Sequence, residues 1–269
     1  MKRYGLVPFC GLMFLVVAST GCNKLRARDQ LNKGVNAYRN AQFQSAIDHF
    51  QQAVSLDPTY VDARIYLARS YFQQYVPSGD SAENIKAGKQ AILAFEDVLK
   101  MDPQNATALA SIGLIYYDMK DFGEAKEFQQ KRMEAEPNNP EPYYWVGVIN
   151  WAVCYKNNAA ARIDDAKLKT PDAQGNLPPL PAKLRDDLNA KNSQLVDDGV
   201  KALEKAVDLR PNYDDAMTYL NLLLRQKADI EADSDARAAD LKSAEDWQQK
   251  AIQTRKNTAA QVPAGGITP

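Results

Sequence analysis

Apolar residues recur along most of the chain at intervals of three and four positions, which is the spacing of one face of an α-helix. Several of these helical stretches end in a short phrase that finishes in proline. The four prolines are Pro58, Pro103, Pro137 and Pro211. Proline blocks a further helical turn because it lacks an amide hydrogen and clashes with the preceding turn. The pattern therefore predicts a series of helices that share one design.

Small residues accompany these prolines at constant positions. The successive prolines are 45, 34 and 74 residues apart, which read as a period of 34 with additions of 11 and 40 residues. A small residue lies twelve positions before each proline, and the preceding helix has one of its own. The two sets are Ala46, Ala91, Ala125 and Gly199, and Gly34, Ala68, Gly113 and Gly147. Small residues on both helices allow two backbones to approach closely.

This pattern resembles the tetratricopeptide repeat (TPR), a helix–turn–helix module with a period of about 34 residues. The resemblance implies an all-α fold, a TPR-type right-handed superhelical solenoid of about five helical hairpins over residues 27–257. The expected repeats are 27–60, 61–105, 106–139, 140–213 and 214–257.

Two insertions interrupt the period. The shorter one, around Val76–Asp80, is expected to be a polar loop between the helices of the second repeat. The longer one lies within residues 155–196 and allows two interpretations, an extended fourth hairpin or a degenerate extra repeat. We favour the extended hairpin, joined by residues 170–181, because an extra repeat would place Asp186 and Asp187 in its buried helix face.

The first residues have the layout of an export signal. Met1–Arg3 is cationic, and residues 4–18 carry no charge but fall short of the ~20 residues of a membrane-spanning helix. The sequence Ala18-Ser19-Thr20-Gly21-Cys22 resembles a bacterial lipobox, in which the cysteine is diacylated and becomes the first mature residue. We therefore expect a lipoprotein signal peptide (1–21), a lipidated Cys22 and a short tether (22–26). An ordinary signal peptide with an incidental cysteine is the alternative.

Composition argues against several other functions. Lys and Arg number 33 against 34 Asp and Glu, so no basic surplus exists to attract nucleic acid. The single histidine, His49, and three cysteines cannot form a His-rich or Cys-rich metal site. Pairs such as Asp164-Asp165 point about 100° apart on a helix and do not make an acid–base dyad. We expect no enzyme activity, no catalytic residue, no metal and no cofactor. Residues 258–269 are expected to be a disordered tail.

A partner-binding groove is expected from the position of the small residue in each first helix. The residues three before, one after and four after it form a stripe that would face the concave surface of a TPR superhelix. The plus-four residue is aromatic in four successive repeats. Partial packing of these rings against the next repeat is the alternative to partner binding. The expected groove residues are Tyr38, Arg69, Phe72, Leu114, Tyr117, Tyr144, Val148, Trp151 and Arg225.

These features together predict a lipid-anchored protein–protein interaction scaffold of the bacterial cell envelope. Its groove would bind a segment of another envelope protein, with assembly of envelope complexes as one use. Asn23, rather than aspartate, follows Cys22 and favours the outer membrane, with the protein facing the periplasm. The alternatives are an accessory glycan-binding or enzymatic envelope protein that uses the fourth-repeat insertion, and a soluble exported TPR scaffold. The sequence pattern names neither the partner nor the oligomeric state.

Overall fold

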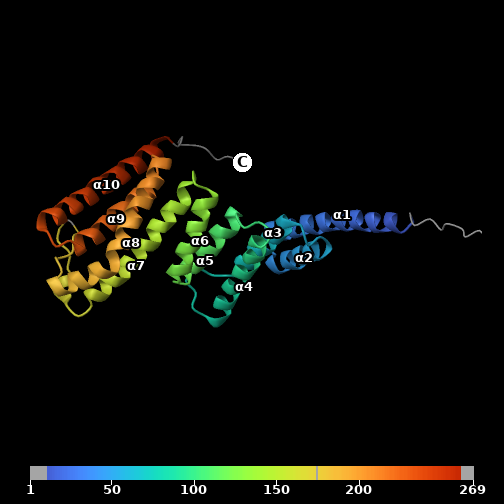
Figure 1. Ribbon diagram of the computed structural model, residues 1–269, viewed down its shortest axis with the longest axis horizontal. Coiled ribbons are helices and arrows are strands. Elements are labelled where there is room, and N and C mark those ends of the chain that lie inside the picture. The colour runs from blue at the N-terminus through green and yellow to red at the C-terminus, as the bar shows by residue number, and fades with distance from the viewer. Residues whose placement is uncertain (1–10, 174, 262–269) are drawn as a thin grey trace, which may run out of the picture. The chain divides into compact units, whose positions relative to one another are not determined.

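The computed structural model describes residues 11–173 and 175–261, and within these residues the chain is helical with no strand (Figure 1). A short 3-10 turn, η1 (Ala166–Lys169), lies between the seventh and eighth helices. The helices are α1 (Gly11–Arg39), α2 (Phe43–Leu56), α3 (Val61–Phe72), α4 (Ala82–Leu99), α5 (Ala106–Asp118), α6 (Phe122–Ala135), α7 (Pro140–Ala161), α8 (Ala182–Leu209), α9 (Asp214–Ile230) and α10 (Ser234–Gln261).

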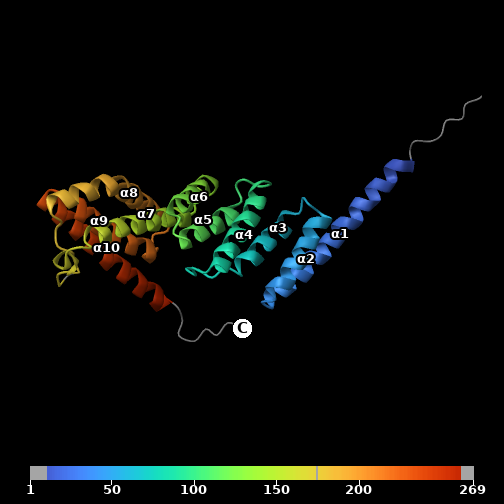
Figure 2. The same ribbon diagram turned by 90° about the horizontal axis from the view of Figure 1, so that it is seen from below.

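The chain divides into two compact units, residues 1–119 and residues 120–269. In the first unit, each helix from α1 to α5 packs against the next one along the chain, and α1 also contacts α3. In the second unit, the helices from α6 to α10 pack in the same consecutive way, and α7 also contacts α9 (Figures 1 and 2). Stacking of consecutive helical hairpins is the architecture of a helical solenoid. The all-α hairpin fold expected from the sequence is confirmed.

The proline phrases end helices where the sequence predicts. The helices α2, α4, α6 and α8 each end two to four residues before their proline. Polar side chains then cap two of the helices that follow, α5 and α7. The Asn105 carboxamide oxygen accepts from the amide of Ala108 at 3.1 Å, and that of Asn139 accepts from the amide of Glu141 at 3.0 Å. Such caps satisfy amides that have no partner within the helix.

The small residues lie where helices come closest. Ala46, Ala91 and Ala125 are completely buried. At Gly147, an added Cβ would lie only 2.3 Å from Cγ of Leu203, on the facing helix α8. The regular spacing of small residues along the sequence therefore marks the positions where two helix backbones approach closely.

The shorter insertion is the loop between α3 and α4, and one side chain closes it. The Asn84 amide nitrogen donates to the carbonyls of Val76 and Gly79, both at 2.8 Å. Its oxygen accepts from the amide of Val76 at 2.7 Å. The polar loop is therefore tied to the first turn of α4.

The longer insertion lengthens the fourth hairpin. Helices α7 and α8 have 22 and 28 residues and pack against each other along their length. Residues 162–181 join them. The structure thus contains the extended hairpin and no extra repeat. Polar contacts hold the far end of the pair, where the amide nitrogen of Asn157 donates to the Asn192 oxygen at 2.8 Å.

Two expected boundaries differ from the structure. Residues 22–26, expected as a tether, belong to α1, because the segment contains no glycine or proline to interrupt a helix. Helix α10 extends to Gln261 and so includes the first four residues of the expected tail, 258–269. Ala259 and Ala260 favour this extension through their helix propensity. Residues 1–10 of the expected signal peptide and residues 262–269 of the tail lie outside the described residues.

No helix among the described residues combines the length and the apolar character that crossing a membrane requires.

Candidate functional site

In the first unit, the expected groove aromatics lie half-buried between neighbouring side chains. The Tyr38 ring meets Tyr66 edge-on, with centroids 6.4 Å apart. Its hydroxyl accepts a hydrogen bond from Nε2 of Gln73 at 2.9 Å. Phe72 stacks on Tyr75 with centroids 6.3 Å apart. The Tyr38 ring therefore joins α1 to α3, and Phe72 packs on the loop that follows α3, while both rings keep part of their surface accessible.

The remaining expected groove residues of the first unit are also half-buried. Arg69 lies over the Tyr66 ring, 5.9 Å from its centroid. Leu114 and Tyr117 lie on α5. None of these side chains reaches full burial, which leaves room for a contact with a ligand.

In the second unit, four aromatic rings form a continuous group that we call the aromatic cluster: Tyr144, Trp151 and Tyr155 of α7 and Tyr219 of α9. Tyr219 meets Tyr144 and Trp151 edge-on, with centroids 5.6 and 5.3 Å apart. Tyr155 stacks on Trp151 at 5.3 Å, and 56% of Tyr155 is exposed. Aromatic side chains that are packed on one side and exposed on the other are typical of protein-binding surfaces.

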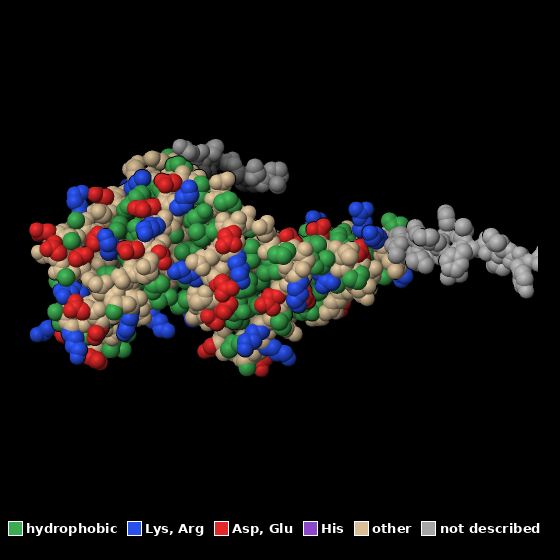
Figure 3. All heavy atoms as spheres, in the orientation of Figure 1, with side chains coloured by type: hydrophobic (Ala, Val, Ile, Leu, Met, Phe, Trp, Pro, Cys, Tyr) green, Lys and Arg blue, Asp and Glu red, His purple; other side chains and the backbone are tan. Residues whose placement is uncertain are grey.

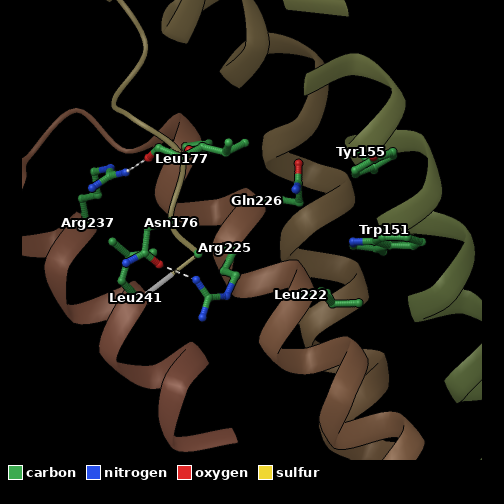
Figure 4. A pocket seen from close by; sticks show the side chains of 11 residues that line it. Trp151, Tyr155, Asn176, Leu177, Leu222, Arg225, Gln226, Arg237 and Leu241 are labelled. Carbon is green, nitrogen blue, oxygen red and sulfur yellow. Dashed lines mark hydrogen bonds between the residues drawn. The ribbon is translucent and has the colours of Figure 1, made fainter. Parts of the chain in front are cut away.

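A cavity of about 160 Å³ opens beside this cluster (Figure 4). Three helices and the 162–181 connection contribute to it. Its lining consists of Trp151 and Tyr155 from α7, Leu222, Arg225, Gln226 and Asp229 from α9, Arg237 and Leu241 from α10, and Gly175, Asn176 and Leu177 from the connection. The cavity thus combines an apolar wall with two arginines. Trp151 and Arg225, both predicted from the sequence, meet there.

Residues 175–180, which we call the strap, form one wall of the cavity. Arg225 Nη1 donates to the side-chain oxygen of Asn176, and Arg237 Nη2 donates to the carbonyl of Leu177 at 2.8 Å (Figure 4). At the other end of the strap, Leu180 is buried in the core of the second unit. The strap is therefore held by surface arginines at its start and by the core at its end.

A buried ion pair supports the strap. Arg162 is 2% exposed, and its Nη2 lies 2.8 Å from Oδ1 of Asp229. Its Nη1 donates to the carbonyls of Leu168 and Pro178, each at 2.9 Å. The side-chain nitrogen of Asn158 completes the network by donating to Oδ2 of Asp229 at 2.6 Å. A charge removed from water must be paired and hydrogen-bonded in this way, so the network fixes the path of the backbone at Pro178.

The Asp229 carboxylate in this network has a structural role. Burial raises the pKa of the Asp229 carboxyl, and the Arg162 charge opposes that rise. One oxygen of this carboxylate is paired with Arg162 and the other accepts from Asn158. The carboxylate therefore fixes the position of Arg162, which in turn binds the strap. Burial also raises the pKa of the Cys154 thiol to about 12, which keeps the thiol protonated and unreactive near neutral pH.

The single histidine and the surface charges have ordinary structural surroundings in the described residues. His49 Nδ1 is hydrogen-bonded to Oε1 of Gln30 at 2.8 Å, an ordinary contact between α1 and α2. The described part of the chain holds no group of three His, Cys, Asp or Glu placed to bind a metal ion. On the face seen in Figure 3, acidic and basic side chains are interspersed.

One expected groove residue is placed wrongly by the sequence reasoning. Val148 is 2% exposed and belongs to the core. The reason is that α7 packs extensively against the first helix of the next hairpin, α9, whereas α1 has only a slight contact with α3. Sequence reasoning also missed Tyr219 and Arg237. Arg237 is 60 residues from its partner Leu177, and no periodic pattern links the two.

Comparisons with known proteins identify the repeats. Residues 31–92 and 106–139 each match a family model described as tetratricopeptide repeat. Among curated relatives, the "Probable UDP-N-acetylglucosamine--peptide N-acetylglucosaminyltransferase SPINDLY" of Hordeum vulgare is 28% identical over 134 residues, which is 50% of this chain and 13% of that protein. The Hsp70-Hsp90 organizing protein of Triticum aestivum is 26% identical over 115 residues, 43% of this chain and 18% of that protein. This chain therefore spans less than a fifth of either relative.

Solved structures agree with the helical fold. A crystal structure of the MamA protein superposes with a TM-score of 0.58 at 14% identity, covering 91% of this chain and 98% of that one. MamA 41-end from Desulfovibrio magneticus RS-1 gives a TM-score of 0.55 at 15% identity, covering 88% and 98%. At a sequence identity of 14–15%, structural similarity shows a shared fold and carries no conclusion about function. The chain is therefore an all-α protein of TPR-type fold in which residues 31–92 and 106–139 are tetratricopeptide repeats.

Proposed function

We propose that this protein is a lipid-anchored scaffold of the bacterial cell envelope that binds a segment of a partner protein, and that it serves in the assembly of envelope complexes. The observation that carries the binding part is the aromatic cluster beside an arginine-lined cavity in the second unit. Helical-repeat solenoids use extended surfaces of this kind to bind other proteins. Tyr, Trp and Arg are also the residues that contribute most to binding energy at protein interfaces.

The name of one relative, Hsp70-Hsp90 organizing protein, is in keeping with a role in bringing other proteins together. That relative supports only the scaffold part of the proposal, because this chain spans 18% of it. The envelope location rests on a different observation, the lipobox-like sequence that ends at Cys22. Cys22 is exposed, as a site of acylation must be. More than one acyl chain at that position would anchor the protein stably, whereas a single chain would bind reversibly.

Membrane fractionation tests the anchor. The Cys22→Ser variant, expressed in a bacterial host, should leave the membrane fraction and accumulate as an uncleaved or differently cleaved form. Mass spectrometry of the wild-type amino terminus should show an acylated cysteine. Equal membrane retention of both proteins would reject the lipid anchor and leave the soluble exported scaffold.

Affinity capture tests the binding surface. Tyr155→Ala removes an exposed ring that lies over Trp151, so it should change the free energy of unfolding by only about 0.5 kcal/mol. It should nevertheless lower recovery of the partner from detergent-solubilised envelope by about tenfold, the effect of losing a central aromatic contact. Ile163→Ala is the matched control, because Ile163 is 63% exposed and does not line the cavity.

Equal recovery with both variants would reject the aromatic cluster as the binding surface. The same rings offer flat faces on which sugars could stack, so the capture is repeated with soluble glycan fragments as competitors. Loss of the captured protein in their presence would favour the glycan-binding alternative.

A further inference from the structure

The strap covers part of the surface that the proposed function assigns to the partner. Asn176 and Leu177 lie against α9 and α10, where they line the same cavity as Trp151 and Arg225 (Figure 4). Each of the two cavity arginines donates to an oxygen of the strap. The strap thus makes, from within the chain, the kind of contacts that a bound peptide would make.

The two ends of the strap are held with different strength. Its end is bound to buried groups, since Arg162 donates to the Pro178 carbonyl and Leu180 lies in the core. Its start, residues 175–177, contacts the helices through Arg225 and Arg237, which donate to oxygens that carry no net charge. Within the connection, the Asp172 carboxylate accepts from the backbone amide of Asn176 at 2.8 Å. Residues 175–177 can therefore leave the surface while the buried network stays in place.

The contacts of the strap indicate what the surface prefers. An oxygen acceptor, the Asn176 side chain, precedes an apolar side chain, Leu177, and the apolar lining of the cavity includes Leu222 and Leu241. A carboxylate in place of the Asn176 amide would form a charge-assisted and bidentate pair with a guanidinium, which is stronger than a bond to a neutral amide. The nearby Asp229 does not cancel this attraction, because its carboxylate is paired with Arg162. Asp172, whose Oδ2 accepts from Nδ2 of Asn176 at 3.2 Å, opposes a carboxylate only at position 176 of the strap itself.

We propose that strap residues 175–177 hold the place of a partner peptide, and that the site accepts an extended segment in which an Asp or Glu directly precedes a leucine-sized apolar residue. The inference rests on the proposed protein-binding function and specifies its partner. The apparent affinity for the partner is the intrinsic affinity multiplied by the fraction of molecules in which the strap is open. Binding of the partner releases residues 175–177. The partner's carboxylate then takes over the contact with Arg225, and the backbone carbonyl of its apolar residue takes over the contact with Arg237.

The experiment uses the full chain and a defined probe. The probe is an acetylated and amidated tripeptide with the sequence of residues 175–177 in which Asn176 is replaced by Asp, and its affinity is measured by calorimetry. The loosened variant, Asn176→Ala with Leu177→Ala, should bind the probe about tenfold more tightly than wild type, because the competing strap is lost. The tightened variant, Asn176→Asp with Asp172→Asn, should bind it about tenfold more weakly, since its strap carries the favoured charge and the Asp172 carboxylate that would repel it is removed.

Two controls separate this mechanism from a general change in the protein. Asn189→Ala changes an exposed asparagine on α8 that does not line the cavity and should leave the affinity unchanged. The unmodified tripeptide, with Asn, should bind the loosened variant about tenfold more weakly than the probe does. Amide hydrogen exchange at Asn176 and Leu177 of the wild type should become faster when the probe binds.

Three results would overturn the inference. Equal affinity of the wild type and both strap variants would mean that the strap does not compete. Absence of probe binding to the loosened variant would mean that the site does not take this chemistry. Slower exchange at Leu177 on binding would mean that the strap stays in place as a wall of the site. Each of these results is compatible with continued partner capture through Tyr155, so failure of the inference is distinguishable from failure of the proposed function.

Discussion

The close approach of α7 and α8 at Gly147 makes a quantitative prediction about packing. A Cβ added at this position would lie 2.3 Å from Cγ of Leu203 and 2.6 and 2.8 Å from its two methyl carbons. Leu203 is completely buried. The whole branched end of the leucine would have to move, and the surrounding core leaves it little space to do so. Gly147→Ala should therefore force α7 and α8 apart.

Two opposing contributions decide the size of the effect. Replacing glycine by alanine inside a helix stabilises the fold by about 0.5–1 kcal/mol through backbone entropy. Overpacking a tight core costs about 1–3 kcal/mol. Contacts below 3 Å on three atoms of one side chain place Gly147 at the upper end of that cost. We expect Gly147→Ala to lower the free energy of unfolding by about 1–2 kcal/mol.

Urea unfolding followed by circular dichroism measures this difference. The matched control is Gly123→Ala on α6, where the nearest atom to an added Cβ, other than neighbours in the helix, is Oδ1 of Asp121 at 3.9 Å. The control should be neutral or more stable by up to about 1 kcal/mol. Equal stability of the two variants, or a more stable Gly147→Ala, would refute the close approach.

A double variant tests whether Leu203 is the side chain responsible. Leu203→Ala alone should cost about 2–5 kcal/mol by leaving a cavity. In combination with Gly147→Ala, the new methyl group enters that cavity and no longer meets a leucine. The double variant should therefore be more stable than the sum of the two single effects by about 1 kcal/mol or more. Simple additivity would assign the strain at Gly147 to another contact.

Three further predictions concern other parts of the fold. Arg162→Met leaves the Asp229 carboxylate buried without its partner and should cost about 3–5 kcal/mol in urea unfolding, with recovery when Asp229→Leu is added; no recovery would argue against the ion pair. The Cys154 thiol, with its pKa raised to about 12, should resist iodoacetamide at pH 8 in a background where Cys10 and Cys22 are replaced by serine, and react only after unfolding, because the thiolate is the reactive form; rapid labelling of the folded protein would contradict its burial. Ala41 has a positive φ of 56°, so Ala41→Gly should raise the free energy of unfolding by about 0.5–1 kcal/mol, and a loss of stability would show that this turn has another conformation.

The repeats were predictable from the sequence because each contributes a local signal. A proline ends a helix wherever it stands, and a small residue at a fixed distance from it marks a helix crossing. Both signals act within one hairpin, so Ala46, Ala91 and Ala125 could be assigned to the core without a structure. The same logic placed Trp151 and Arg225 on one surface, and they do line one cavity.

The rest of the site depends on contacts between residues far apart in the sequence. Arg162 and Asp229 are 67 positions apart, and the pair forms only because the lengthened α7 brings its last turn beside the end of α9. The misplacement of Val148 has a similar origin. The calculated stripe fails where the lengthened α7 packs extensively against α9, the first helix of the next hairpin. Insertions therefore mark the places where a repeat pattern loses its predictive value.

The continuity of α1 across residues 22–26 has a mechanical consequence. A helix rises about 1.5 Å per residue, so Cys22 lies about 26 Å along a rigid rod from Arg39, with no hinge between them. Because α2 packs along this rod, a lipid attached at Cys22 would set the tilt of the first hairpin as well as its distance from the bilayer. A force applied to that hairpin would likewise reach the anchor as a torque. Two glycines inserted after Arg26 would replace the rigid helical connection by a flexible one, and a lipid at Cys22 would then no longer set the orientation of the first hairpin.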